Sequence, residues 1–445
     1  MCNFRTRLDE MKKSVLGLLL LFVMVISGQA QQVDAGNGHA IILDENGDVW
    51  TVGRNNFGQL GSGTFINSPI PVKVEGLPKI KTVSRGYDHS LAIDVYGKVW
   101  IWGRNNYGQI GSWNLENHNK PKKFNHSKKM AAIEGGHWHS VAIAEDGTVW
   151  AWGHNFFAEL GTGDREHSEF PKQVLCELDG TKRHLHGIEQ IASVGYHTLA
   201  LDSNGRVYTW GSNDYRELGN SSNRNETVAR LVELPKIKSV AAGWHHSIAL
   251  DEDGRVWFWG RDQAKRLLSR EEQIISKPIL LEMPSIQKIA SGSWHSLALD
   301  ESGQVWGWGS NRYGFLGTGD TISHSLPIKM KGLNNIREIG GGCFQSMAVD
   351  IDGNILTCGD NPSGQQGINN YKRVFEAKAM VLNTSGVLSI NQPEKGIDSE
   401  SYSIGRNIMS PDTETSENSG NKTIWWLLSI SVLLNLLLIY RFFRK

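Results

Sequence analysis

The chain has 445 residues, and its 46 Lys and Arg are balanced by 46 Asp and Glu, so the formal net charge at pH 7 is zero. This balance excludes the global positive field that attracts nucleic acid, and we expect no nucleic-acid partner. Four cysteines are too few to hold a chain of this length together by disulfides.

Residues 1–30 have the composition of a secretory signal peptide. Two lysines follow Met11, an apolar run extends from Val15 to Ile26, and the small residues Gly28 and Ala30 come next. A positive segment, a short apolar segment and small residues before the cleavage point are typical of exported proteins. We predict cleavage after Ala30, with an uncleaved anchor as the alternative.

A phrase of about fifteen residues then occurs seven times along the chain. It reads GDVWTVGRNNFGQLG at its first occurrence and GKVWIWGRNNYGQIG at its second. The glycines that open the copies are 50, 50, 58, 49, 49 and 50 residues apart: Gly47, Gly97, Gly147, Gly205, Gly254, Gly303 and Gly353. A fixed period of this length predicts a repeat architecture.

Each copy predicts a β-hairpin. In the second copy, the apolar run His89–Ile93 is followed by the turn Asp94–Gly97 and by the strand Val99–Trp102. Both faces of this strand are apolar, so both must be covered. Seven small sheets packed as the blades of a propeller meet that demand, with this phrase as the inner hairpin of each blade. The predicted fold is all-β, a seven-bladed β-propeller over residues 31–392.

Two copies show the repeat in its most complete form. They read GYDHSLAIDVYGKVWIWGRNNYGQIG, from Gly86 to Gly111, and GSWHSLALDESGQVWGWGSNRYGFLG, from Gly292 to Gly317. They match G-x-x-H-[ST]-x-A-L-x-x-x-G-x-[VL]-[YW]-x-W-G-x-N-x-x-G-Q-L-G, and the chain therefore resembles the regulator of chromosome condensation repeat family from about Val33 to about Val381. The resemblance implies a seven-bladed propeller. Members of that family that exchange nucleotide on a small GTPase work in the nucleus or cytoplasm.

The two ends of the repeat region predict how the ring closes. The first copy begins at Val33 and lacks the strand that precedes the second copy at Leu77–Val83. After the last copy, Ala377–Ile390 contains a similar segment that has no hairpin of its own. We predict that Val387–Ile390 pairs with the N-terminal copy.

Histidine and aspartate recur at fixed positions of the repeat. One histidine per blade cannot place several ligands within about 2.1 Å of one metal, so we interpret these residues as hydrogen-bonded to backbone and predict no metal and no cofactor. The aspartates are favoured residues of tight turns and lack the later carboxylates of a calcium loop. The histidine positions are His39, His89, His139, His197, His246 and His295, with Gln345 in the seventh copy; the aspartates are Asp44, Asp94, Asp202, Asp251, Asp300 and Asp350.

Nothing in the sequence assembles a catalytic group. The GTGD segments at Gly161 and Gly317 are not followed by Gly-Lys-Ser/Thr, and neither Gly-x-Ser-x-Gly nor His-Glu-x-x-His occurs. We predict that the protein is not an enzyme.

Six copies place an aromatic residue between the glycine and the histidine that open the hairpin. These positions are expected to project together at one rim of the central channel, and large aromatic residues on a rigid scaffold are typical binding hot spots. The alternative is that the rings pack on one another and fill the channel mouth. The residues are Tyr87, Trp138, Tyr196, Trp244, Trp294 and Phe344.

Two departures from the repeat concentrate positive charge. We interpret them as solvated loops of drifted repeats, and the alternative is a patch that binds a polyanionic partner such as a surface polysaccharide. The fifth copy contains Arg261, Lys265, Arg266 and Arg270, and the extra residues Cys176–Gln190 before the fourth copy contain Lys182, Arg183, His184 and His186.

Two cysteines lie on opposite strands of the seventh predicted hairpin. An exported compartment would allow Cys343 and Cys358 to form a disulfide. We interpret both cysteines as buried free thiols, and the disulfide is the alternative.

The C-terminal region predicts a membrane anchor. Residues 393–423 read as a disordered linker, residues 424–440 as a single transmembrane helix and residues 441–445 as a basic cytoplasmic tail. Trp425 and Trp426 precede the apolar segment, and Arg441 follows it. A sorting tail removed during surface attachment is the alternative.

Together these features predict a monomeric, non-enzymatic propeller. We expect it to be tethered to a membrane, displayed at the cell surface or in the periplasm, and to bind a protein or another macromolecule through one loop rim. By family analogy the alternative is a guanine-nucleotide exchange factor for a small GTPase, which requires a propeller that faces the cytoplasm. A propeller-based lyase or hydrolase would need carboxylates clustered at the channel.

Overall fold

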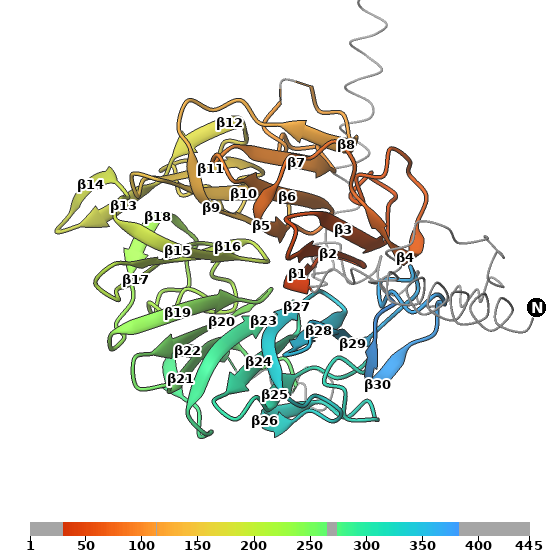
Figure 1. Cartoon of the computed structure of the whole chain (residues 1–445). Helices are drawn as coiled ribbons and strands as arrows, with labels where there is room; N and C mark the ends of the chain where they lie inside the picture. The colour runs from red at the N-terminus through yellow and green to blue at the C-terminus, as the bar shows by residue number, and fades with distance from the viewer. Residues whose placement is uncertain (1–29, 113, 265–273, 382–445) are drawn as a thin grey trace, which may run out of the picture. The chain divides into compact units, whose positions relative to one another are not determined.

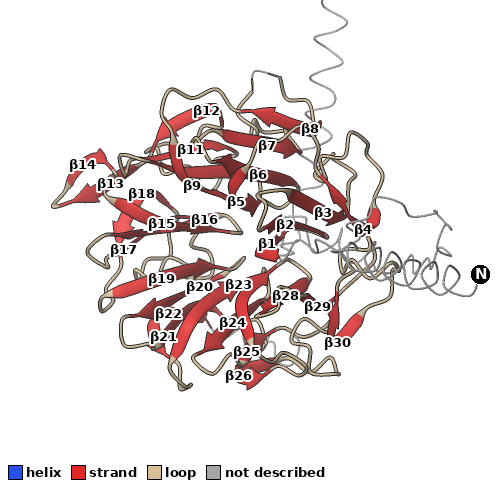
Figure 2. Ribbon diagram, viewed as in Figure 1, coloured by secondary structure: helices blue, strands red, loops and turns tan. Residues whose placement is uncertain are grey.

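The computed structural model describes residues 30–112, 114–264 and 274–381 (Figure 1). All regular structure in these residues is β, in seven sheets arranged around a central axis (Figure 2). The predicted seven-bladed propeller is therefore confirmed. No helix among the described residues is long and apolar enough to cross a bilayer. The segment 424–440, the linker 393–423 and residues 1–29 lie outside them.

The first strand of each blade lines the central channel. Each of these strands contacts the first strand of the two neighbouring blades, and they surround the centre of Figure 1. They are β1 (Ala30–Ala35), β5 (Ile80–Arg85), β9 (Met130–Gly135), β15 (Ile188–Ser193), β19 (Ile237–Ala242), β23 (Ile286–Ser291) and β27 (Ile336–Gly341).

The predicted hairpin forms the two middle strands of each blade rather than its inner pair, and the repeated phrase contributes the third strand and the loop that follows it. The second strands are β2 (His39–Asp44), β6 (His89–Asp94), β10 (His139–Ala144), β16 (His197–Asp202), β20 (His246–Asp251), β24 (His295–Asp300) and β28 (Gln345–Asp350). The third strands are β3 (Val49–Gly53), β7 (Val99–Gly103), β11 (Val149–Gly153), β17 (Val207–Gly211), β21 (Val256–Arg261), β25 (Val305–Gly309) and β29 (Ile355–Gly359).

The fourth strands form the outer edge of the blades. They are β4 (Ser68–Lys73), β8 (His118–Lys123), β12 (Ser168–Gln173), β18 (Glu226–Leu231), β22 (Ile274–Leu280), β26 (His324–Lys329) and β30 (Val374–Ala379). The extra residues before the fourth copy form a hairpin, β13 (Leu175–Leu178) and β14 (Thr181–His184), rather than a loop. Strand β13 pairs in parallel with β18 and widens that blade to six strands.

The core lies between neighbouring blades, as the apolar character of both strand faces predicts. Val99 and Ile101 pack in a cluster with residues of the third blade, whereas Trp102 packs in a cluster with residues of the first. Trp102 is fully buried, and its indole Nε1 donates to the Gln59 carbonyl of the first blade at 2.9 Å. Each blade is therefore stabilised mainly by its two neighbours.

The described residues close the ring through strand β1 of the first blade. Strand β1 supplies the first blade's own inner strand, so the expectation that the first copy lacks one is wrong. Strand β1 contacts β27 and β28, the Ala30 N–H donates to the Gly353 carbonyl at 3.3 Å, and Arg337 donates to the Ala30 carbonyl at 2.6 Å. Ala30, the last residue of the predicted signal peptide, is thus buried in β1. Val387–Ile390 lies outside the described residues.

The strands end at two faces of the propeller. We call the end with the turns between second and third strands the turn face, and the opposite end, with the connections between first and second strands, the loop face. Ala30 lies beside the Gly353 turn, and β30 ends at Ala379 opposite Leu356, just after that turn. Both ends of the described propeller therefore lie at the turn face.

Candidate functional site

The aromatic residues predicted to form a rim gather on the loop face at the mouth of the channel. The imidazole of His137 lies at their centre, with ring centroids 4.1 Å from Tyr87, 4.2 Å from Trp138, 4.6 Å from Tyr196 and 5.4 Å from Trp244. Tyr87 of the second blade and Trp244 of the fifth are 6.0 Å apart. The rings therefore meet across the mouth, and we call these five residues and Trp294 the aromatic cluster.

The cluster has a buried side and an accessible side. Tyr87, Trp244 and Trp294 are 4%, 6% and 8% exposed, whereas Trp138 and Tyr196 remain partly exposed. The rings thus pack on one another at the mouth, as the alternative interpretation of these residues requires. The sixth predicted residue, Phe344, is not part of this cluster and packs against the rings of Tyr313 and Phe315.

Backbone bonds between blades hold these loops in place. The Tyr87 N–H donates to the Gly136 carbonyl, and the His137 N–H donates to the Gly195 carbonyl. Gly103, which closes the third strand, has a φ of +105°, and a Cβ there would lie 2.7 Å from the Asp88 carbonyl oxygen. Only glycine combines this positive φ with so close a contact to the preceding loop. Together with the backbone bonds between blades, this contact holds the loops in a fixed arrangement.

The repeated histidines lie beneath the loops and are structural, but they bond to side chains rather than to backbone. In six blades, Nε2 lies within hydrogen-bond distance of a serine hydroxyl of the next blade. Burial lowers the pKa of these imidazoles to about 3, or about 4 for His139. The pairs are His39–Ser90 (3.3 Å), His89–Ser140 (3.1 Å), His139–Ser193 (3.1 Å), His197–Ser247 (2.8 Å), His246–Ser296 (2.9 Å) and His295–Ser346 (2.7 Å). Within the described residues, no group of three potential ligands is placed to hold a metal.

Two arginines that the sequence analysis did not single out flank the aromatic cluster. Arg54 and Arg104 each contact the buried carboxylate of Asp88, at 3.4 and 3.2 Å. The Arg104 guanidinium also lies over the rings of Phe57 and Trp138, at 4.8 and 5.2 Å from their centroids. Two positive charges share one negative charge, which leaves this sector of the loop face positive.

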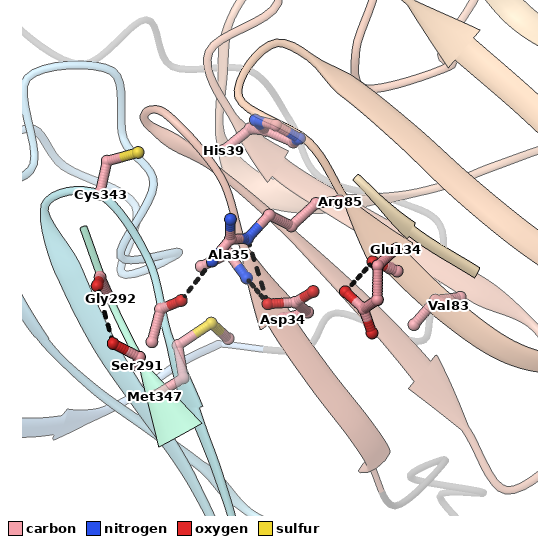
Figure 3. Close-up of polar contacts among 12 residues, drawn as sticks. Asp34, Ala35, His39, Val83, Arg85, Glu134, Ser291, Gly292, Cys343 and Met347 are labelled. Carbon is pink, nitrogen blue, oxygen red and sulfur yellow. Dashed lines mark hydrogen bonds and ion pairs between the residues drawn. The ribbon is translucent and has the colours of Figure 1, made fainter. Parts of the chain in front are cut away.

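A buried charged cluster lies within the channel (Figure 3). Arg85 donates to Asp34 at 3.2 Å and to the Gly341 carbonyl at 2.7 Å, and Ser84 donates to Glu134 at 2.9 Å. Burial, and then the charge of Asp34, raises the pKa of Glu134 to about 8, and burial also raises the pKa of Asp34. Glu134 therefore retains a proton at neutral pH.

The predicted basic patch of the fifth copy is only partly described. Arg261 is 5% exposed and lies over the Tyr215 ring at 4.5 Å from its centroid, so it is not part of an exposed patch. Lys265, Arg266 and Arg270 lie outside the described residues. The second predicted group is on the surface, because Lys182, Arg183, His184 and His186 are all exposed.

The two cysteines of the seventh blade are buried free thiols, so the alternative of a Cys343–Cys358 disulfide is not formed. Cys358 pairs in register with Ser346 and donates to the Phe315 carbonyl, whereas Cys343 lies before β28 and accepts from Ser293. Burial raises the pKa of Cys343 to about 11 and that of Cys358 to about 12. Neither thiol is therefore a nucleophile at neutral pH.

Seven blades, six of four strands and one of six, define a repeat propeller of the RCC1 type, with a Gly-x-x-His loop at the channel mouth in five of them. Residues 21–236 match the RCC1-like domain, and two models of the regulator of chromosome condensation (RCC1) repeat match residues 237–264 with 286–314 and residues 253–299 with 302–349. The chain belongs to the RCC1 repeat family.

Known relatives share the repeat and the fold. The chain is 40% identical over 62 residues to the ultraviolet-B receptor UVR8 and 48% identical over 46 residues to the mitochondrial RCC1 domain-containing protein RUG3, both of Arabidopsis thaliana. These matches span 14% and 10% of each relative, and the same shares of this chain.

Solved structures align over much more of the chain. Prp20p of Saccharomyces cerevisiae, described with its binding to Gsp1p and histones, has a TM-score of 0.68 at 23% identity, over 78% of this chain and 88% of its own. Human WBSCR16 has a TM-score of 0.63 at 21% identity, over 71% and 86%. At such identities the likeness establishes the fold.

Proposed function

We propose that this protein is a non-enzymatic binding module whose loop face holds a protein partner. The observation that supports it is the accessible side of the aromatic cluster, which continues into a larger aromatic patch. Trp138 stacks on Tyr107, with centroids 5.1 Å apart, and Phe157 contacts both Tyr196 and the 62% exposed Phe156. Tryptophan, tyrosine and arginine are the residue types that dominate binding energy at interfaces.

We further propose that the propeller is tethered to a membrane and faces outside the cytoplasm. This rests on the signal-peptide pattern of residues 1–30 and the apolar segment 424–440. Ala30 and Ala379 both lie at the turn face. The described end that precedes the predicted anchor in the chain is therefore at the turn face.

A photo-crosslinking amino acid in place of Phe156 tests the binding face. We expect one crosslinked protein species with the full chain in its native membrane, and none when the same group replaces Tyr96, which is 69% exposed on the turn face. The added change Trp138→Ala should weaken binding by about 2 kcal/mol, roughly thirtyfold, because it removes an interface anchor. Crosslinking from Tyr96 alone would overturn the proposal.

Protease treatment of intact cells, with N-terminal sequencing of the mature protein, tests the location. A new start near Gln31 and a cleavable propeller would support export. A protected propeller would overturn it and make nucleotide exchange on a small GTPase, the alternative that family membership supports, the function to assay.

A further inference from the structure

The aromatic cluster contains buried hydrogen-bond donors that have no partner among the described residues. His137 is 3% exposed and Trp244 is 6% exposed. The described residues offer no hydrogen-bond partner to either ring nitrogen of His137, or to the indole Nε1 of Trp244 and Trp138. A buried polar group without a hydrogen bond destabilises the fold, so groups of this kind in a folded protein point to a ligand or to bound water.

Indoles buried between the blades, unlike those at the channel mouth, are mostly hydrogen-bonded. The strand tryptophans Trp102, Trp152, Trp210 and Trp259 each donate to a backbone carbonyl of the preceding blade at 2.7–2.9 Å, and Trp308 is the exception among the described ones. At the mouth, by contrast, the loops of the third and fifth blades bring together ring nitrogens that have no hydrogen-bond partner among the described residues. His137 lies 4.2 Å from Trp138 and 5.4 Å from Trp244 between ring centroids.

The surrounding charge determines which ligand these donors fit. Arg54 and Arg104 share the carboxylate of Asp88, and the described residues provide no acceptor for the buried Nε of Arg54. Glu159, also on the loop face, is already bound by His154 at 2.6 Å. Indole and guanidinium groups donate and cannot accept, so the complementary group is an anionic acceptor.

We infer that the channel mouth receives the carboxylate of an acidic side chain from the protein partner, which enters on the accessible side between Trp138 and Tyr196. The inference rests on the proposed function, because it names the partner group that the loop face would bind. The Trp138 and Tyr196 ring centroids are 6.1 Å apart, and both residues are partly exposed. The carboxylate would accept from the indoles and from Arg54.

Selection of random twelve-residue peptides on the full chain, reconstituted in lipid nanodiscs, tests the inference. We expect enrichment of peptides with an Asp or Glu, and about tenfold weaker binding when that residue becomes Asn or Gln. Arg54→Gln and Trp244→Phe should each weaken the acidic peptides about tenfold as well, since each removes a donor to the carboxylate. Arg54→Lys should restore part of the loss, and the urea midpoint of each variant reports its folding.

Each other outcome has a distinct meaning. Peptides that lose affinity with Trp138→Ala but contain no required acid would overturn the inference and leave the proposed function standing. Acidic peptides that bind Arg54→Gln and Trp244→Phe as well as the unchanged chain would also overturn it. Sodium acetate that competes at millimolar concentration would identify a free carboxylate, rather than a partner side chain, as the occupant. Peptides insensitive to Trp138→Ala would count against the loop face itself.

Discussion

Side-chain hydrogen bonds organise the turn face, whereas backbone hydrogen bonds between blades organise the loops of the loop face. At the turn face, Asp44 accepts from the backbone of Asn46 and Asp48 at 2.9 Å and from Trp50 Nε1 at 3.0 Å, all within one blade. At the loop face, bonds cross between blades: the Asn37 N–H donates to the Tyr87 carbonyl of the next blade. The side-chain bonds of a turn aspartate therefore stay within one blade, although the turn glycine carbonyl also accepts from the next blade, as Gly47 does from the Ile80 N–H at 3.0 Å.

This difference explains where the seven copies diverge. The turn aspartates recur in six blades because their side-chain hydrogen bonds lie within one blade. On the loop face, the residue after the third strand is Arg54, Arg104, His154 or Ser212 in successive blades. The two arginines contact Asp88, whereas His154 contacts Glu159 and Ser212 donates to Glu217. The copies therefore diverge at this position of the face that we propose to bind a partner.

The largest expected effect separates the two ends of a single strand. His246 begins β20, is 1% exposed and lies 2.9 Å from both Ser291 and Ser296 of the next blade. His246→Ala should cost about 3 kcal/mol in the free energy of unfolding, because it leaves a cavity and removes the shared partner of two buried hydroxyls. Urea unfolding of the full chain measures the loss.

Asp251, at the other end of β20, is the matched control. Its carboxylate is buried, but it accepts from the backbone of Asp253 and Arg255 and from Trp257 Nε1, residues that are exposed or half-buried and can bond to water instead. Asp251→Ala should therefore cost only about 1 kcal/mol. His246→Gln, which copies Gln345 of the seventh blade, should cost less than His246→Ala. Equal losses at the two ends of the strand would contradict the distinction between the faces.

A smaller effect concerns pH and the channel between the two faces. The Glu134 carboxyl has a pKa near 4.5 when unfolded, and burial followed by the charge of Asp34 raises it to about 8 in the fold. Between these values the unfolded chain has released the proton that the folded chain keeps. Stability contributed by this group is thus present below pH 4.5 and is lost as the pH rises toward 8.

Glu134→Gln should remove this loss. Because the channel leaves part of the Glu134 side chain accessible, we expect the unchanged protein to lose about 1–2 kcal/mol relative to the variant between pH 6 and 8. Urea unfolding of both chains across that interval measures it, and the histidines titrate equally in both. Parallel stability curves would show that Glu134 is ionised in the folded protein.

Structural features that recur in most copies could be predicted from the sequence, whereas features that occur in a single blade could not. The blades, the turn aspartates and the structural histidines follow from a local pattern copied along the chain. Strand β1 was missed because its sequence, AQQVDA, has few apolar residues and directly follows the predicted leader. The contacts of Asp88 with Arg54 and Arg104 were missed because they join residues 34 and 16 positions apart and occur in one sector only. Burial of the aromatic cluster depends on rings from opposite blades, which no local pattern reveals.

The smallest expected effect concerns a loop-face position where the copies differ in residue type but share a bond. His167 Nδ1 accepts from the Asn155 N–H at 2.8 Å, and Asn67, Asn117 and Asn225 accept the equivalent bond through their amide oxygens. His167→Asn preserves this acceptor, so the free energy of unfolding should change by less than about 0.5 kcal/mol, whereas His167→Ala should cost about 1 kcal/mol. If His167→Asn also weakened partner binding, measured by crosslinking from Phe156, the exposed imidazole would belong to the interface. Unchanged crosslinking would instead place His167 among the interchangeable residues that only support the loop.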